Sequence, residues 1–174
     1  MTDTVATPYP ILWLRSLAFW AIFPLSILFY VILLLLLFPL SYPRRWAIVQ
    51  TWVHFVLWLL RVTCRLTSHV EGTEHIGSGP AIVMSKHQST WETVALQTIF
   101  PRQVWVAKRE LFWIPIFGWG MALMKSIAID RGSGRAAVAQ LVSKGTARLQ
   151  EGNWVVLFPE GTRIPPGKRG RYRI

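Results

Sequence analysis

Apolar and polar positions divide the chain into two parts at about residue 65. Residues 16–43 contain no charged side chain, and residues 29–40 are almost entirely aliphatic or aromatic. At about 1.5 Å per residue, a helix of that length exceeds the roughly 30 Å hydrocarbon core of a bilayer. The pattern predicts a membrane-associated helix over 16–43, kinked at Pro24.

A second apolar run covers residues 46–60 and ends at Arg61. As a helix, this run would be only about 22 Å long, which is short for a membrane crossing. If both runs crossed, Arg44-Arg45 and the remainder of the chain would lie on opposite sides of the bilayer. We therefore expect an interfacial helix or the second arm of a hairpin that enters one leaflet, and a core helix packed on the domain is the alternative.

After residue 65 the pattern changes to short apolar runs separated by turn residues. Alternation of strand-like and helix-like segments is typical of α/β domains. We expect an α/β fold, a mixed sheet with flanking helices, preceded by an N-terminal membrane-associated helical hairpin. The expected domains are 1–65, a membrane-anchoring segment, and 66–174. The expected strands are 81–84, 104–107, 126–129 and 153–158, and the expected helices begin near Ser89 and at Ser133.

Composition favours lipid partners over nucleic acid. The formal net charge is +11, hydrophobic residues make up 52% of the chain, and there are ten tryptophans. The basic residues are scattered, the aromatic residues lie in apolar runs, and no nucleic-acid-binding module is recognisable. Anionic headgroups and phosphorylated substrates fit this charge better. Cys64 is the only cysteine, which excludes an intrachain disulfide and a cysteine zinc cluster, and we expect no metal ion.

Candidate chemistry lies where the first expected strand meets a helix. His87 follows residues 81–84, and Ser89-Thr90-Trp91-Glu92 has the pattern of a capping box. A neutral imidazole can take a proton from an alcohol through one nitrogen while a carboxylate orients the other. On these residues alone, a simple helix cap beside a turn histidine is an equal alternative.

Three motifs then resemble those of the glycerolipid acyltransferases, specifically the 1-acyl-sn-glycerol-3-phosphate (lysophosphatidate) acyltransferases. They are His87-Gln88-Ser89-x-x-Glu92, Ile129-Asp130-Arg131 and Phe158-Pro159-Glu160-Gly161-Thr162-Arg163. The resemblance covers residues 70–163. Position 92 carries glutamate where the family usually has aspartate, and the family's fourth motif does not occur before Ile174. We therefore expect a domain that is incomplete at its C-terminal end.

The resemblance implies a membrane-bound enzyme that moves a fatty acyl group from a thioester to lysophosphatidate. His87 would be the general base and Glu92 its orienting acid, with backbone N–H groups near Ser89 as candidate donors to the oxyanion. The implied acyl donor is acyl-CoA or acyl-ACP, and no further cofactor is expected. Partners would be membrane lipids, with the catalytic domain on the cytoplasmic face, at the inner membrane in a bacterium. The implied substrate-binding residues are Arg131, Glu160, Gly161, Thr162 and Arg163, and Lys108, at a strand end, is a further candidate.

Alternative functions stay open at this point. A membrane-bound serine hydrolase would use Ser85 or Ser89 with His87, although no G-x-S-x-G elbow is present. An inactive membrane-anchored fragment is a second alternative. Gly132-x-Gly134-x-x-Ala137 matches a dinucleotide fingerprint, a weak signal on its own. The aromatic and methionine-rich residues 112–124 are core, membrane-facing surface or the wall of an acyl-chain tunnel.

Overall fold

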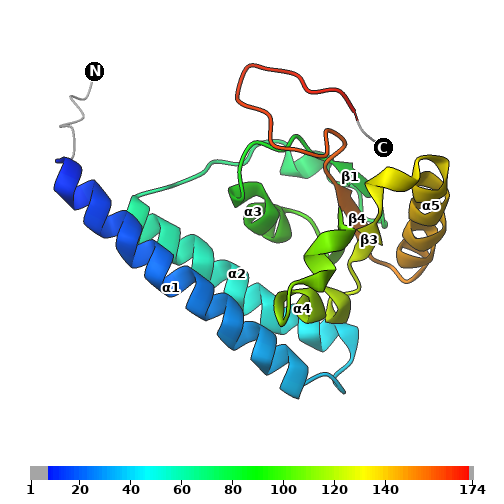
Figure 1. Ribbon diagram of the computed structural model, residues 1–174, viewed down its shortest axis with the longest axis horizontal. Coiled ribbons are helices and arrows are strands. Elements are labelled where there is room, and N and C mark those ends of the chain that lie inside the picture. The colour runs from blue at the N-terminus through cyan, green and yellow to red at the C-terminus, as the bar shows by residue number, and fades with distance from the viewer. Residues whose placement is uncertain (1–7, 173–174) are drawn as a thin grey trace.

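The computed structural model describes residues 8–172, which form an α/β unit joined to a long helical hairpin (Figure 1). The hairpin consists of α1 (Tyr9–Leu36) and α2 (Tyr42–Cys64). In Figure 1 it forms a rod along one side of the α/β unit, with its turn at the lower end. The prediction of an α/β fold with an N-terminal helical hairpin is confirmed. The domain division after residue 65 stays a prediction.

The two helices of the hairpin pack through aromatic and β-branched side chains. Phe23 of α1 stacks on Trp52 of α2 with ring centroids 6.3 Å apart. On its other side, α2 buries Val53 and Val56 against Val94 of α3 (Trp91–Ile99). Much of α1 faces outward with large apolar side chains, including Trp13, Leu14, Trp20, Leu25, Phe29 and Leu36. This exposed apolar surface is typical of a segment that contacts lipid.

Both helices of the hairpin are longer than the apolar runs that predicted them. α1 includes Arg15, whose guanidinium group donates hydrogen bonds to the carbonyls of Thr63 and of Val62, the latter at 3.3 Å. A cation at the C-terminal end of α2 is favourable because the last carbonyls of a helix lack intrahelical partners. The charge at position 15 therefore lies inside α1 instead of ending it.

The prediction that the second helix is too short to cross a membrane was wrong. Arg44, Arg45 and Arg61 lie inside α2, which has 23 residues and a length of roughly 34 Å. By length and composition, each helix of the hairpin is able to cross a membrane. The length of α2 is thus sufficient for a crossing, and the hairpin that enters a single leaflet stays a prediction.

The sheet has four strands in the order β1-β4-β2-β3, and all three pairings are parallel. The prediction of flanking helices is confirmed, but the described strands form a parallel sheet where we expected a mixed one. A helical segment follows each of the first three strands and carries the chain back across the sheet, which makes neighbouring strands parallel. The strands are β1 (Ile82–Met84), β2 (Gln103–Lys108), β3 (Ile127–Ile129) and β4 (Trp154–Leu157).

Helices cover both faces of this sheet. On one face α5 (Arg135–Gln150) contributes Ala137 to a core with Val104, Ile127 and Val155. On the other face lie α3, α4 (Phe117–Leu123) and the hairpin (Figure 1). Every residue of β4 is buried, as expected for an interior strand of a parallel sheet. Three short 3-10 helices complete the described elements: η1 (Thr73–His75), η2 (Arg109–Trp113) and η3 (Arg131–Ser133).

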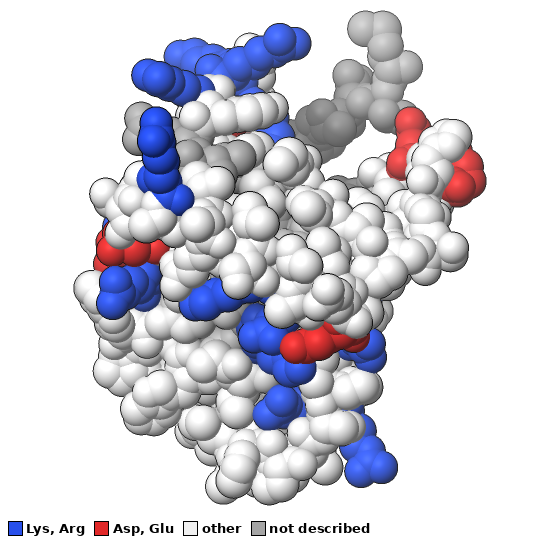
Figure 2. Space-filling model, turned by 90° about the vertical axis from the view of Figure 1, so that its right-hand side faces the viewer, with Lys and Arg blue, Asp and Glu red and all other residues white. Residues whose placement is uncertain are grey.

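Charge is distributed in separate groups on the surface. In the view of Figure 2, Lys and Arg side chains lie in several places with wide uncharged areas between them. Near the amino ends of the strands, Lys125 and Arg148 both bind Glu151, at 2.5 Å and 2.8 Å respectively.

Candidate active site

The three predicted motifs lie at the carboxyl ends of β1, β3 and β4, and Lys108 is the last residue of β2. Because all strands are parallel, these ends lie at one edge of the sheet, where α/β folds commonly bind ligands. The strand order places the loop after β1, with His87, beside the loop after β4, which begins at Phe158. β2 and β3 are paired so that Lys108 and Ile129 are register partners, and Arg131 follows two residues after Ile129.

The structure brings His87 and Glu92 together at this edge. His87 Nδ1 lies 3.9 Å from Glu92 Oε1, and both side chains are largely buried, with 15% and 14% of their surfaces exposed. His87 precedes α3 and Glu92 lies in its first turn, so the histidine folds back over the start of the helix. The distance allows a charge interaction between a carboxylate and an imidazolium.

Glu92 is fixed by a set of hydrogen bonds at the beginning of α3. Its carboxylate accepts from the backbone N–H of Ser89 at 2.8 Å and 3.0 Å, from the N–H of Gln88, and from the Ser89 hydroxyl. The Ser89 Oγ in turn accepts from the N–H of Trp91 at 3.0 Å. The half of the predicted capping box in which Glu92 accepts from the backbone N–H of Ser89 is therefore present. The Ser89 hydroxyl accepts from the N–H of Trp91 in place of that of Glu92, and the helix itself begins at Trp91.

These hydrogen bonds determine the charge of Glu92. Burial raises the pKa of its carboxyl group, but the Ser89 hydroxyl and the N–H groups of Gln88 and Ser89 stabilise the anion more strongly. The pKa of Glu92 consequently lies below its ordinary value of 4.5. The group next to His87 is an anion at neutral pH.

The same bonds correct the prediction for the oxyanion donors. The N–H groups of Gln88 and Ser89 point at the Glu92 carboxylate, and the N–H of Trp91 donates to Ser89. In this arrangement they do not point toward a substrate carbonyl. These N–H groups of the helix N-terminus orient the acid.

An aromatic stack that the sequence analysis missed holds the imidazole in place. The rings of His87 and Phe158 are nearly parallel, 12° apart in orientation, with centroids separated by 4.0 Å. Trp105 also packs against the Phe158 ring, with the two ring centroids 5.6 Å apart. The carbonyl of His87 also accepts from the N–H of Ile164 at 2.8 Å. His87 is thus held from both β1 and the segment after β4.

Glu160 belongs to the third motif and connects it to the first. Its buried carboxylate accepts from the N–H of Gly170 at 2.9 Å, from the N–H of His87, and from Lys86 Nζ at 3.4 Å. The Gly170 bond, followed by the nearby Lys86 charge, keeps the pKa of Glu160 below its ordinary value although burial opposes this. Its contacts fix the chain around His87.

The other predicted binding residues are arranged around the same edge. Arg163 is exposed and donates from Nη2 to Thr90 Oγ1 at 2.8 Å, which places its guanidinium beside the start of α3. Gly161 has φ of 66°, a left-handed conformation that favours glycine, and Thr162 is exposed. Lys108 Nζ pairs with Glu110 at 3.0 Å. The backbone of Arg131 follows β3, and its side chain lies outside the described part of the chain.

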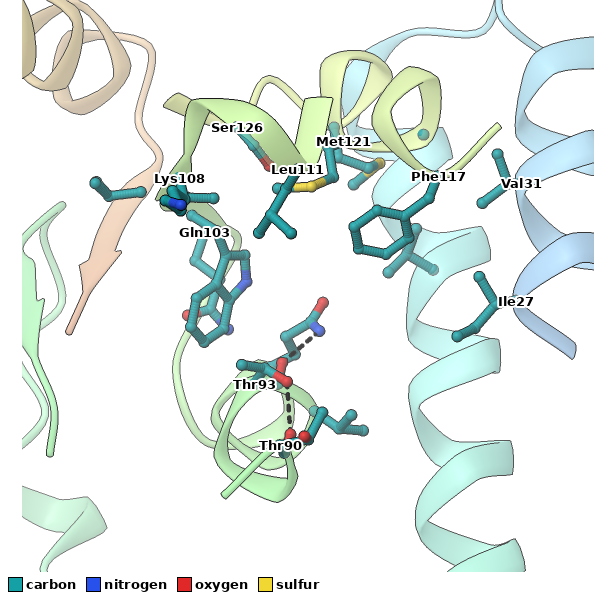
Figure 3. A pocket seen from close by; sticks show the side chains of 18 of the residues that line it. Ile27, Val31, Thr90, Thr93, Gln103, Lys108, Leu111, Phe117, Met121 and Ser126 are labelled. Atoms are coloured by element: carbon teal, nitrogen blue, oxygen red, sulfur yellow. Dashed lines mark hydrogen bonds between the residues drawn. The ribbon is translucent and has the colours of Figure 1, made fainter. Parts of the chain in front are cut away.

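A cavity of about 550 Å³ opens beside these residues. His87, Thr90, Lys108 and Arg163 lie on its lining, while the remainder is mainly apolar and comes from the hairpin, α3, β2 and α4. Figure 3 shows Ile27 and Val31 of α1 on one side, Gln103 and Lys108 on the opposite side, and Phe117 and Met121 above. Residues 112–124 therefore contribute a cavity wall, while Trp113 and Trp119 remain exposed. Within residues 8–172, no three His, Cys, Asp or Glu side chains gather to form a metal site.

Comparison with known proteins agrees with this geometry. The family model described as Acyltransferase matches residues 67–173, more than half of the chain. The chain belongs to the acyltransferase family. The match contains all three motifs and begins shortly after α2.

Two relatives within the acyltransferase family carry the same name. A 1-acyl-sn-glycerol-3-phosphate acyltransferase from Pseudomonas aeruginosa is 47% identical over 125 residues, 72% of this chain and 49% of the relative. One from Saccharomyces cerevisiae is 30% identical over 141 residues, 75% of this chain and 44% of the relative. The chain thus spans about half the length of these relatives.

A solved acyltransferase structure has the same fold. The crystal structure of PlsC, the 1-acyl-sn-glycerophosphate acyltransferase from Thermotoga maritima, superimposes with a TM-score of 0.68 at 25% identity. The match covers 89% of this chain and 63% of that chain.

Proposed function

We propose that the protein transfers a fatty acyl group from an acyl thioester to the free hydroxyl of lysophosphatidate, which yields phosphatidate. The observation that carries this proposal is the His87–Glu92 pair at the mouth of a mainly apolar cavity, with Arg163 on the same lining. The names of the relatives support the same reaction.

In the proposed reaction His87 is the general base. Its Nδ1 faces Glu92, so the opposite ring nitrogen takes the proton from the acceptor hydroxyl. The hydroxyl oxygen attacks the thioester carbonyl, a C–O bond forms and the C–S bond breaks. The imidazolium then returns its proton to the departing thiolate, so that an ester and a thiol leave. The Glu92 anion stabilises the imidazolium between these two transfers.

Phosphate and acyl groups require different surroundings, and the site offers both. A planar guanidinium such as that of Arg163 suits phosphate oxygens, and we assign Lys108 and Arg131 to the same role. Gly161 and Thr162 contribute the loop that presents Arg163, and Glu160 supports that loop from behind. The apolar part of the cavity would hold the acyl chain.

We also propose that the hairpin anchors the protein in the membrane, with the active site on the cytoplasmic face, at the inner membrane in a bacterium. The outward apolar side chains of α1 and the arginines Arg44 and Arg45 just after its turn support this orientation. The acyl donor is a thioester of coenzyme A or of acyl carrier protein, and no other cofactor enters the reaction.

The serine-hydrolase alternative gains no support from the site. The Ser89 hydroxyl donates to Glu92 and the Ser85 hydroxyl donates to the Lys86 carbonyl at 3.2 Å, so neither donates to His87. The test is an assay of purified protein with lysophosphatidate and a labelled acyl thioester. We expect labelled phosphatidate from the wild type and a loss of at least a hundredfold in His87→Ala. Release of free fatty acid without phosphatidate would refute the transfer reaction.

A further inference from the structure

Two buried polar atoms in the cavity wall have no hydrogen-bond partner among the described residues. They are Oε1 of Gln103 and Nε1 of Trp105, which lie two residues apart on the same face of β2. Gln103 is 1% exposed, and both residues line the cavity. A nearby polar group in the lining is satisfied, since Gln97 Nε2 donates to the Thr93 carbonyl at 2.8 Å.

The orientation of the Gln103 amide is set by the protein. Its Nε2 donates to the carbonyl of Leu96 at 2.8 Å. Turning the amide over would place two oxygens against each other, so Oε1 has to face away from Leu96. The indole of Trp105 can only donate. The wall therefore contains one acceptor of fixed orientation and one donor on the same face of β2.

Leaving such groups unpaired is costly. A buried donor or acceptor without a partner loses the hydrogen bond that it would make in water. A saturated hydrocarbon chain in the cavity satisfies neither group. A hydroxyl group has both of the functions that the two atoms require, because it accepts from an N–H and donates to an amide oxygen.

The aromatic stack locates this polar pair relative to the reacting centre. Trp105 packs on Phe158 at 5.6 Å, and Phe158 stacks on His87 at 4.0 Å. Trp105 is thus close to the imidazole, and Gln103 lies two residues nearer the amino end of β2. The wall of α1 opposite Gln103 carries Ile27 and Val31 (Figure 3). A hydroxyl near the thioester end of an acyl chain would meet the polar pair, and the rest of the chain would meet hydrocarbon.

We propose that the Gln103–Trp105 pair is a binding site for a hydroxyl group on the acyl chain, near its carboxyl end, so that the cavity selects hydroxylated over saturated acyl groups. This inference rests on the proposed function for the assignment of the cavity to the acyl chain. The pair would bind the acyl chain and would take no part in the proton transfer at His87.

The first experiment compares two acyl thioesters of equal length, one saturated and one 3-hydroxylated, with lysophosphatidate and purified protein. We expect kcat/KM to be about tenfold higher for the hydroxylated chain, from one to two hydrogen bonds. Trp105→Phe and Gln103→Leu should each lower that ratio severalfold. Trp119→Phe, an exposed indole outside the cavity lining, is the matched control and should leave the ratio unchanged.

Equal kcat/KM values for the two thioesters, or a preference for the saturated one, would overturn the inference. A ratio that stays constant in both cavity variants would also overturn it, since an enclosed water molecule or a contact with the reacting carbonyl would then account for the pair.

A second measurement separates this inference from the proposed function. The corresponding free acids are compared by thermal shift, and we expect a larger shift with the 3-hydroxy acid in the wild type but not in Trp105→Phe. Discrimination between the acids without turnover of either thioester would refute the proposed function alone. Turnover of both thioesters without discrimination in either measurement would refute this inference alone.

Discussion

Glu92→Gln removes a charge while keeping the size of the side chain, and it tests how the acid supports the base. At 3.9 Å and an effective dielectric constant of about 20, a carboxylate and an imidazolium attract each other by about 4 kcal/mol. Some of that attraction is screened by solvent. In the proposed reaction His87 becomes charged only during turnover, so the loss should appear in kcat. We expect kcat to fall by about a hundredfold to a thousandfold with a smaller change in KM.

The assay is initial-rate phosphatidate formation over a range of both substrates. Glu71→Gln is the matched control, because Glu71 lies 3.5 Å from His69 in a pair that is almost fully exposed. A kcat for Glu92→Gln within about tenfold of the wild type would refute the electrostatic role. Glu92→Asp keeps the charge but shortens the arm that reaches the N–H groups of Gln88 and Ser89, so we expect an intermediate loss.

Glu92 also makes a prediction about stability. Its pKa in the folded protein is below 4.5, so its hydrogen bonds contribute fully above pH 4.5 and are lost as the pH falls through the lowered value. The difference in free energy of unfolding between wild type and Glu92→Gln should be constant near neutral pH and shrink below pH 4.5. Denaturant titrations across that range would show it, and a difference that grows on acidification would contradict the assignment.

Three further substitutions test other parts of the structure. Arg163→Ala should raise KM for lysophosphatidate about tenfold while KM for the thioester changes little, and equal increases for both would refute the phosphate role. Arg15→Ala removes the hydrogen bonds to the last carbonyls of α2 and should lower the free energy of unfolding by about 1–2 kcal/mol, measured by denaturant titration. In Gly120→Ala the new Cβ would lie 3.0 Å and 3.1 Å from the two γ-methyl groups of Val31, which we expect to cost about 1 kcal/mol. Adding Val31→Ala should relieve that strain, and a double variant no better than the sum of its parts would contradict the contact.

The sequence predicted the strands well because each is a short apolar run with turn residues on both sides. It also contained the evidence for a parallel sheet, since the expected segments alternate strand and helix. The hairpin lengths could not be predicted from charge alone. Arg15 marks a boundary in the hydropathy pattern. Its long side chain nevertheless reaches the end of the neighbouring helix α2, so residue 15 lies within α1.

The sequence predicted which residues form the candidate site better than it predicted how these residues are arranged. His87 and Glu92 follow from local spacing, because five residues around a helix start determine their approach. The stacking of Phe158 on His87 and the bond from Ile164 depend on the neighbouring position of β1 and β4, which lie far apart in the sequence. The unpaired groups of Gln103 and Trp105 likewise become visible only when burial is known.

Among the described strands, β4 comes last along the chain yet lies between β1 and β2 in the sheet. During synthesis, the earlier strands therefore have a gap at their centre until residues 154–157 arrive. Phe158 and Ile164, which hold His87, arrive with that strand. A nascent chain can consequently present its hairpin while His87 is not yet held, and the proposed general base is in place only when β4 completes the sheet.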